Sequence, residues 1–343
     1  MIAALTHELE LKAPTFLEPI ETIYFGGGTP SLLQTSELST LLNTIYAQFD
    51  VIASPEITLE ANPDDIHLEK AVEWKRAGIN RLSIGIQSFD SHILQWMNRA
   101  HTAEQALKCI DCIREAGFDN FSIDLIYGSP QQSLKAWEKD LSLVFKLRIP
   151  HISCYALTLE EKTVLHHMVK SGTRENVNPD HQADCFSLLL KQMHAHGYLH
   201  YEISNFCIPN HESKHNKSYW EGKPYLGIGP SAHSYQTNTR CWNVSNNIQY
   251  IKSIEEDTIP QECEMLTAEQ QWNEYIMTSL RTAEGISKKR ISDQWGDKAC
   301  IVLNEEIKRF VQTGKMIETE QSWKLSEEGK FLADGIAAEF FKI

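Results

Sequence analysis

The stretch that decides the fold is Ile23-Tyr24-Phe25-Gly26-Gly27-Gly28-Thr29-Pro30, where an apolar β-type run ends in three glycines, a hydroxyl and a proline. Consecutive glycines give up side-chain packing, so they suit backbone that adopts positive φ or approaches another group closely. A parallel strand that ends this way presents bare backbone groups at the edge where α/β folds place their sites. An ordinary tight turn is the alternative. No Lys-Ser/Thr pair follows, and the glycine spacing is not that of a dinucleotide fingerprint, which excludes both phosphate-binding motifs.

Outward from this stretch, apolar β-type runs alternate with helical patterns over residues 1–206. Strands are expected at 21–27, 56–61, 81–87, 120–127, 151–157 and 199–205, and helices at 35–48, 67–77, 90–117, 133–146 and 178–196. Strands separated by single helices form right-handed parallel β/α units. This pattern predicts an α/β fold, a complete or partial TIM-like β/α barrel rather than a doubly wound sheet.

The segments at the start of the chain and after residue 206 depart from the alternating strand and helix pattern. Residues 2–17 resemble the back half of a helix, so we expect that a segment with the first barrel strand is missing before them. Residues 207–262 are loop-rich, and residues 263–343 read as helices followed by a hairpin at 316–325, which predicts a winged-helix-like domain. Acidic residues outnumber basic ones in that last part, so protein contact or a lid is favoured over DNA binding.

Composition limits the location and the partners. The 343 residues include 32 Lys and Arg against 46 Asp and Glu, a net charge of −14, which argues against a nucleic-acid surface. No apolar run could span a bilayer and no signal peptide is visible, so a cytoplasmic protein is expected. The eight cysteines lack the density of a disulfide scaffold, which fits a reducing compartment. Cys109 and Cys112 lie in a helical pattern that predicts a core helix rather than a metal site.

Polar residues recur where the expected strands end. Glu60 and Gln87 lie at or near the ends of two successive expected strands, and Asp124 lies inside the next one. If these strands are parallel neighbours, their side chains face one barrel mouth together with the glycines 26–28, where carboxylates suit the hydroxyls or amino group of a small polar ligand. The alternative is that Glu60 and Asp124 form buried salt bridges, for example with Arg81 or Arg99.

Several motifs in order resemble the oxygen-independent coproporphyrinogen oxidase family of radical S-adenosylmethionine (SAM) proteins. These motifs are Gly26-Gly-Gly-Thr-Pro30, Glu60-Ala-Asn-Pro63, Leu82-Ser-Ile-Gly-Ile-Gln-Ser-Phe89, Asn98-Arg99, Ile123-Asp-Leu-Ile-Tyr-Gly128 and Tyr201-Glu-Ile-Ser-Asn-Phe206. The resemblance covers essentially the whole chain. Within the family, His215-Asn-Lys-Ser-Tyr-Trp220, followed by Tyr225-Leu-Gly-Ile-Gly-Pro-Ser-Ala-His-Ser-Tyr235, is similar to the HNxxYW signature of the HemW group of haem chaperones.

The resemblance implies a SAM site and a haem-related region. The implied SAM residues are Gly27, Gly28 and Thr29 at the methionine amino end, with Glu60, Gln87, Arg99, Asp124 and Ala156 lining the rest. Backbone carbonyls can accept from an ammonium, and an arginine offers a bidentate partner to a carboxylate. The implied haem region contains His215, Tyr219 and Trp220, with His233 as the competing iron ligand. A loop anchored by aromatics is the alternative for this region.

One departure from the family concerns the iron–sulfur cluster. Radical SAM proteins hold a 4Fe-4S cluster through CxxxCxxC, and this spacing occurs nowhere in the sequence. A missing N-terminal segment is the simplest explanation, and the chain as written is expected neither to bind the cluster nor to cleave SAM. Three functions stay open: a haem chaperone that delivers haem to acceptor proteins, an oxygen-independent coproporphyrinogen III dehydrogenase, and a cluster-free protein that only binds a ligand or partner.

Overall fold

The computed structural model describes residues 1–342, and contacts divide the chain into two compact units. One unit, called the barrel unit here, contains Tyr24–Leu33 and Ile57–Ser213. The other, called the terminal unit, contains Met1–Ile23, Gln34–Glu56 and the chain from Lys214 onward. Strands β1 and β2 begin in the terminal unit and end in the barrel unit.

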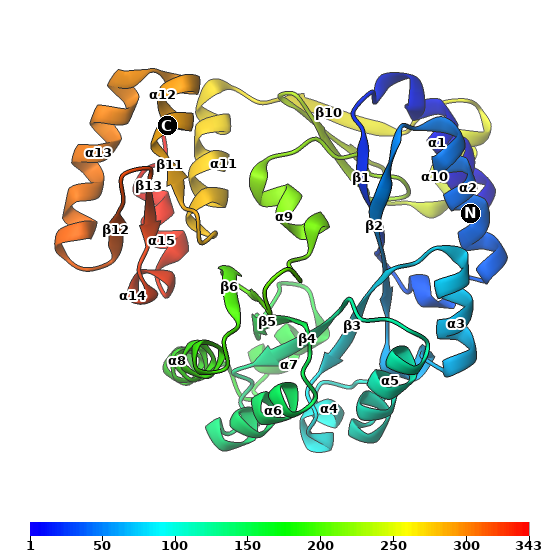
Figure 1. Ribbon diagram of the computed structural model, residues 1–343, viewed down its shortest axis with the longest axis horizontal. Coiled ribbons are helices and arrows are strands. Elements are labelled where there is room, and N and C mark those ends of the chain that lie inside the picture. Colours follow the sequence, from blue (N-terminus) through cyan, green and yellow to red (C-terminus); the bar gives the residue numbers. More distant parts are fainter. Residues whose placement is uncertain (343) are drawn as a thin grey trace. The chain divides into compact units, whose positions relative to one another are not determined.

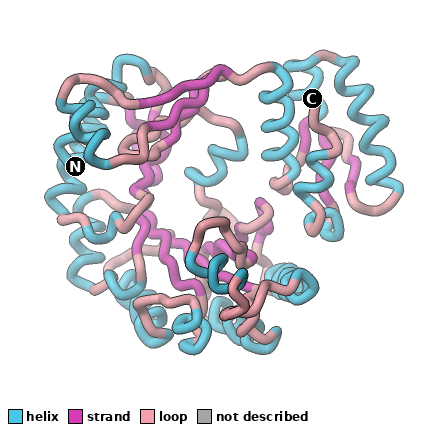
Figure 2. The backbone as a smooth tube through the Cα atoms, turned by 180° about the vertical axis from the view of Figure 1, so that it is seen from behind, coloured by secondary structure: helices cyan, strands magenta, loops and turns pink. Residues whose placement is uncertain are grey.

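The largest sheet has seven strands in the order β1-β2-β3-β4-β5-β7-β6. Their bounds are β1 Ile20–Phe25, β2 Val51–Ala61, β3 Arg81–Gln87, β4 Phe121–Tyr127, β5 His151–Ala156, β6 Leu199–Glu202 and β7 Asn205–Cys207. Strands β2 to β5 pair in parallel with their sequence neighbours, and Figure 2 shows the strands side by side. The predicted parallel β/α units are therefore confirmed from β2 to β5, and the sheet forms a half-barrel.

The helices of the barrel unit cover the outside of this half-barrel (Figure 1). Their bounds are α3 Leu68–Ala77, α4 Ser91–Trp96, α5 Ala103–Glu115, α6 Leu134–Lys146, α7 Val164–Lys170 and α8 Pro179–Ala195. The sequence sets the ends of these helices: Thr102 and Gln105 form a capping box before α5, and Gly78 ends α3 with a φ of 106°. Cys109 is buried in α5, which confirms the predicted core helix.

The last predicted strand of the barrel pattern differs from the structure. Residues 199–205 were expected to form a sixth parallel strand, but the chain turns at Ile203 and Ser204 and forms the hairpin β6–β7. Strand β7 pairs antiparallel with β5, and β6 lies at the edge. All three residues of β7 are buried, and in β6 Tyr201 and Glu202 are buried whereas Leu199 is exposed. The reversal places Phe206 and Cys207 in the core beside β5.

The terminal unit contains two small antiparallel sheets, β10-β9-β8 and β11-β13-β12. The strands are β8 His233–Gln236, β9 Thr239–Asn243, β10 Gln261–Met265, β11 Ile286–Ser287, β12 Met316–Glu318 and β13 Ser322–Leu325. The helices are α1 Ile2–Lys12, α2 Thr35–Gln48, α9 Lys214–Glu221, α10 Asn247–Glu255, α11 Ala268–Leu280, α12 Lys288–Trp295, α13 Asp297–Gln312, α14 Glu327–Lys330 and α15 Ala333–Ala338. Helices α11 to α13 and the β12–β13 hairpin confirm the predicted winged-helix-like end (Figure 1).

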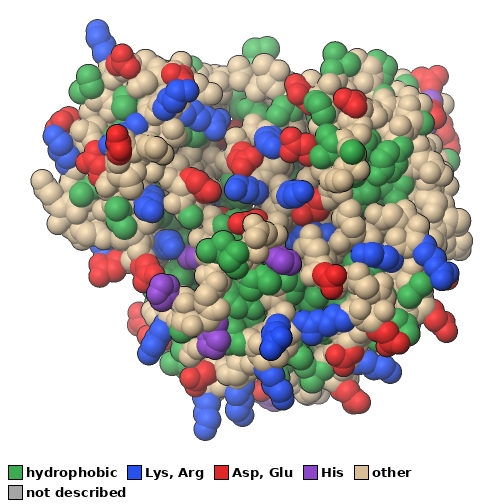
Figure 3. Space-filling view, viewed as in Figure 1, with side chains coloured by type: hydrophobic (Ala, Val, Ile, Leu, Met, Phe, Trp, Pro, Cys, Tyr) green, Lys and Arg blue, Asp and Glu red, His purple; other side chains and the backbone are tan. Residues whose placement is uncertain are grey.

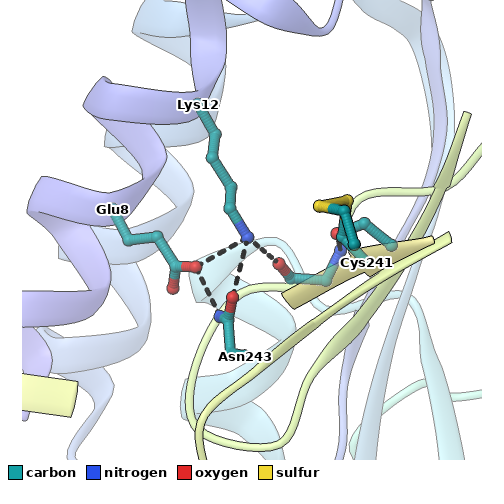
Figure 4. The surroundings of a disulfide bond; sticks show 7 residues. Glu8, Lys12, Cys241 and Asn243 are labelled. Carbon is teal, nitrogen blue, oxygen red and sulfur yellow. Dashed lines mark hydrogen bonds and ion pairs between the residues drawn. A yellow bond between two sulfur atoms is a disulfide. The ribbon is translucent and has the colours of Figure 1, made fainter. Parts of the chain in front are cut away.

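A buried polar cluster joins α1 to β9 inside the terminal unit (Figure 4). Lys12 Nζ lies 2.7 Å from Glu8 Oε1, and the two side chains are 4% and 0% exposed. The Glu8 carboxylate also accepts from the Gly229 amide, from Asn243 Nδ2 and from the Tyr250 hydroxyl. Lys12 donates further to Asn243 Oδ1 and to the Gly227 carbonyl oxygen. The buried ion pair is thus surrounded by hydrogen bonds, the condition that such a pair requires.

A disulfide between Cys241 and Cys263 joins β9 to β10 near this cluster (Figure 4). The two residues are directly opposed in the antiparallel register, and their Cα atoms lie 4.1 Å apart. Spacing along the chain gives no sign of the pair, because 22 residues separate the cysteines and only the strand register brings them together. The terminal unit therefore contains a covalent link that the cysteine count alone does not indicate.

Replacement of both Cys241 and Cys263 by serine is expected to lower the free energy of unfolding by about 3 kcal/mol, because a cross-link closing a loop of this length restricts the unfolded chain. Urea unfolding without reductant should show the loss. Reductant should lower the stability of the wild-type chain to the same level and leave the variant unchanged. Cys112→Ser, which removes a free thiol, is the matched control. If reductant leaves the free energy of unfolding of the wild-type chain unchanged, the prediction is contradicted.

Candidate functional site

The predicted SAM residues all belong to the barrel unit and are called the strand-end site: Gly27, Gly28, Thr29, Glu60, Gln87, Arg99, Asp124 and Ala156. Glu60 lies near the end of β2, Gln87 ends β3, Asp124 lies in β4 and Ala156 ends β5. Strands β2 to β5 pair in parallel, so the strand ends that carry Glu60, Gln87 and Ala156 face the same way, whereas Asp124 lies in the middle of β4. The charges of Glu60 and Arg99 act on Asp124, which shows that it lies near them. Parallel β/α folds bind ligands at the carboxyl ends of their strands.

Glu60 connects β2 to the glycine turn after β1. Its Oε1 accepts from the Tyr24 hydroxyl at 2.7 Å, and its Oε2 accepts from the Gly27 amide at 3.3 Å. A Cβ on Gly26 would lie 2.6 Å from the Tyr24 ring, so a side chain does not fit there. Gly27 and Gly28 both have positive φ, at 74° and 69°, and no atom lies within 4 Å of a Cβ built on either. The glycine turn is therefore open backbone beside a carboxylate.

Arg99 and Gln87 converge over Gly85. Arg99 Nη2 donates to Asn62 Oδ1 at 2.9 Å and to the Gly85 carbonyl oxygen at 3.3 Å. Among the described residues Arg99 Nε is buried without a hydrogen-bond partner. A Cβ on Gly85 would lie 2.9 Å from Gln87 Nε2 and 3.5 Å from Arg99 Nη2. The guanidinium therefore has an unused donor at the strand-end site, and such a donor suits a ligand carboxylate.

Asp124 brings an acidic group with a shifted pKa to the same site. Burial raises the pKa of Asp124 to about 6, and a hydrogen bond from Ser153 opposes this shift. The Glu60 carboxylate also raises the pKa, whereas the Arg81 and Arg99 charges lower it. Asp124 is therefore a weaker acid than an exposed aspartate and takes up a proton at a higher pH. Ala156 lies opposite Tyr127 at the end of β5 and presents little more than backbone.

Three contacts at the strand-end site were missed from the sequence. Tyr24 binds Glu60, Asn62 binds Arg99, and Ser153 binds Asp124. Asn62 had a usable signal, because it follows Glu60 by two residues and alternate strand residues share a face. Tyr24 and Ser153 had none, because only the pairing of strands shows which side chains they meet.

The predicted haem residues belong to the terminal unit and are His215, Tyr219, Trp220 and His233. His215 and Tyr219 lie one turn apart on α9, with ring centroids 5.0 Å apart. The Tyr219 ring contacts Tyr225 at 4.8 Å, and the Tyr225 ring lies 6.2 Å from Tyr235 of β8. His215, Tyr219, Tyr225 and Tyr235 thus form a continuous row, called the aromatic row here. The structure brings His215 and Tyr219 together.

His215 is held firmly within the terminal unit. Its Nδ1 lies 2.7 Å from Thr22 Oγ1, its Nε2 lies 3.0 Å from the Tyr219 hydroxyl, and its amide donates to Glu56 Oε1 at 3.0 Å. A bond from Nδ1–H to Thr22 would leave the Nε2 lone pair facing Tyr219. This is the tautomer in which a histidine coordinates metal through Nε2.

Trp220 and His233 differ from His215 in their surroundings. Trp220 Nε1 is buried with no hydrogen-bond partner in the described part of the chain, and the Arg281 guanidinium lies 5.8 Å from the Trp220 ring centroid. His233 begins β8, is exposed, and has its ring 6.2 Å from that of Trp242 across the strand pair. His233 and Tyr235 are two residues apart on one strand, so they share a face of β8.

On the face drawn in Figure 3, acidic and basic side chains are interspersed and no continuous basic field covers it. Within residues 1–342, no three His, Cys, Asp or Glu side chains are grouped where they could hold a metal ion. The helices described there are too short or too polar to cross a membrane.

Comparisons with known proteins show the family and the fold to which this chain is similar. Residues 5–144 match the radical SAM superfamily, and residues 266–332 match the HemN C-terminal domain. The heme chaperone HemW of Bacillus subtilis is 34% identical over 330 residues, which cover 96% of this chain and 87% of that protein. The heme chaperone HemW of Escherichia coli is 31% identical, with coverages of 94% and 84%. The solved structure of the coproporphyrinogen III oxidase HemN from Escherichia coli shares the fold, with a TM-score of 0.83 at 22% identity, covering 99% of this chain and 82% of that one.

Proposed function

The chain belongs to the HemW family within the radical SAM superfamily, and we propose that it is a cytoplasmic haem chaperone that binds haem and delivers it to an acceptor protein. The observation that carries the proposal is the geometry of His215. Thr22 lies at its Nδ1, and its Nε2 faces the hydroxyl of Tyr219, which is 40% exposed. Imidazole is a common ligand of haem iron, and a hydrogen bond at the other ring nitrogen fixes the ligating tautomer.

The aromatic row supplies the rest of a haem-binding surface. Porphyrin is a large flat apolar ring, and aromatic side chains at its edge or face bind it through apolar contact. His215 would have to exchange its contact with the Tyr219 hydroxyl for the iron, which a rotation of the exposed tyrosine allows. Such an exchangeable ligand suits a chaperone, because the haem must leave again.

We further propose that the strand-end site holds SAM, and its residues fit this molecule. The free Nε of Arg99 would bind the methionine carboxylate, and the open backbone at Gly27 and Gly28 with Thr29 would meet the amino group. Glu60 and Asp124 would accept from ribose hydroxyls, with Gln87 and Ala156 completing the wall. When bound, SAM supplies a sulfonium group that can be cleaved reductively.

The residues present do not fit the 4Fe-4S cluster of the family. The printed sequence has no CxxxCxxC, and the structure groups no three metal-ligating side chains among residues 1–342. Cys109 is buried in the core, and burial raises the pKa of its thiol to about 12, which disfavours the thiolate that a cluster needs. The described residues therefore offer this cluster no set of thiolate ligands.

The test of haem binding compares three porphyrins by absorbance titration. Haem should bind saturably with a shifted Soret band, and it should bind more tightly than iron-free protoporphyrin IX, because only haem gains an iron–nitrogen bond. Bound haem should pass to added apomyoglobin as a stand-in acceptor. Coproporphyrin III is the third ligand: if it binds and haem does not, the coproporphyrinogen III dehydrogenase becomes the better assignment. If none of the three binds, the chaperone proposal fails.

A further inference from the structure

The turn after β3 has an unusual backbone at Gln87. Gln87 has a φ of 67°, and the Ser88 amide donates to the Ile86 carbonyl oxygen at 2.8 Å. A bond between residues two apart around a positive φ is the rare and strained form of γ-turn. Glycine would adopt this φ freely, whereas glutamine does so only where the surrounding structure enforces it. The register of β3 against β4 also shifts between Ile84 and Gln87.

One side of this turn is held by the loop between α4 and α5. His101 Nε2 lies 2.9 Å from the Ile86 carbonyl oxygen, and Arg99 donates to the Gly85 carbonyl oxygen. His101 is 3% exposed, and burial lowers its pKa, so the neutral ring donates through Nε2. The two carbonyl groups immediately before Gln87 are thereby fixed.

Asp140 of α6 holds the other side. Its Oδ2 accepts from the Ser88 hydroxyl at 2.7 Å, and its Oδ1 accepts from the Phe89 amide at 3.1 Å. The Ser88 hydroxyl oxygen also accepts from the Asp90 amide at 3.0 Å. Both carboxylate oxygens of Asp140 are therefore used on the two residues that follow Gln87.

The position of Asp140 in its helix shows that this contact has a specific role. The buried stripe of α6 consists of Trp137, Asp140, Leu141 and Val144, and Asp140 is only 2% exposed. A carboxylate in an apolar stripe is unfavourable unless it is fully hydrogen-bonded, and burial raises its pKa to about 6. An apolar residue would pack there without that penalty, so the benefit of Asp140 lies in the turn that it binds.

We propose that Asp140 is a positioning residue for ligand binding: through Ser88 and Phe89 it holds Gln87 in the strained turn, so that the Gln87 amide stays beside Arg99 over Gly85. The inference rests on the proposed SAM site, and it adds a residue that does not touch the ligand. Without Asp140 the turn would relax, and Gln87 would leave the place where it can meet SAM.

The first measurement is SAM affinity by equilibrium dialysis on the full chain. Asp140→Asn and Ser88→Ala should each weaken SAM binding by about tenfold, whereas Asp111→Asn on the exposed face of α5 should leave it unchanged. In a Gln87→Gly background Asp140→Asn should cause no further loss, because the side chain to be positioned is gone. Equal affinity of wild-type and Asp140→Asn chains, or full additivity of the two changes, would overturn the inference.

A second measurement separates this inference from the proposed SAM site. Gln87→Gly should raise the melting temperature of the wild-type chain by a few degrees, because glycine relieves the strained φ, but it should raise that of Asp140→Asn much less. A merely structural Asp140 would show the same glycine effect in both backgrounds, which would overturn positioning. If the wild-type chain fails to bind SAM, the SAM site is wrong, and the melting temperatures still decide whether Asp140 constrains Gln87.

Discussion

Replacement of Lys12 by methionine is expected to lower the free energy of unfolding by about 3 to 5 kcal/mol, because it leaves a buried carboxylate without its cation. The Glu8 side chain is fully buried, so water cannot replace the lost ammonium group. Three hydrogen-bond donors would still reach Glu8, from Gly229, Asn243 and Tyr250, but none of them carries a charge. Methionine keeps the length of the side chain, which confines the change to charge and hydrogen bonding.

Urea unfolding of the full chain measures the effect, and the chain offers a matched control. Lys308 pairs with Glu305 at the same 2.7 Å distance on α13, but both side chains are more than half exposed. Lys308→Met should therefore change the free energy of unfolding by less than about 1 kcal/mol. Glu8→Gln combined with Lys12→Met should recover part of the loss, because no buried charge remains. Equal effects of Lys12→Met and Lys308→Met would show that the buried pair contributes nothing special.

The parallel part of the sheet was predictable because its signal is local. Each strand from β2 to β5 contains an apolar run and is followed by one or two helices, and parallel pairing follows from that alternation. The same logic placed Glu60 and Gln87 toward the carboxyl ends of parallel neighbours, and the charge of Glu60 also acts on Asp124 in the middle of β4. The family motifs added Arg99 and the histidines, which periodicity alone would not have selected.

What escaped prediction depends on contacts between distant segments. The β6–β7 hairpin reverses at Ile203 and Ser204 without a glycine or proline, so the segment carried only a weak turn signal. The bond from Asp140 to Ser88 spans 52 residues and needs the packing of α6 against the β3 turn. Cys241 and Cys263 meet only through the register of β9 and β10. In each case the deciding quantity is a three-dimensional distance that no local pattern determines.

The strain at Gln87 also shows why the site is harder to predict from the sequence than the fold is. Local preference would place a glycine at a φ of 67°, but the residue with this φ is Gln87. A residue other than glycine at such a φ is a local conflict of the kind that proteins keep at functional sites. The conflict between backbone and residue type is visible only once φ is known.

Replacement of His215 by alanine is expected to abolish the Soret shift on haem titration, because the iron loses its imidazole ligand. Thr22→Ala should weaken haem binding by about 10- to 100-fold without abolishing it, because Thr22 only orients the ring through Nδ1. Tyr219→Phe should preserve binding, since it removes the hydroxyl that competes for Nε2 and keeps the ring. The graded order of these three variants is what direct ligation by His215 predicts.

Two further histidines make the titration decisive. His92 lies on the surface of the barrel unit, so His92→Ala should bind haem as the wild-type chain does and controls for nonspecific imidazole binding. His233 is exposed on β8 and is the competing ligand. If His233→Ala abolishes the Soret shift while His215→Ala, folded by circular dichroism, retains it, iron ligation belongs to β8 and the α9 proposal is wrong. If neither folded variant changes the spectrum, the iron is not held by either histidine, and the dehydrogenase or a simple ligand-binding relative becomes the better assignment.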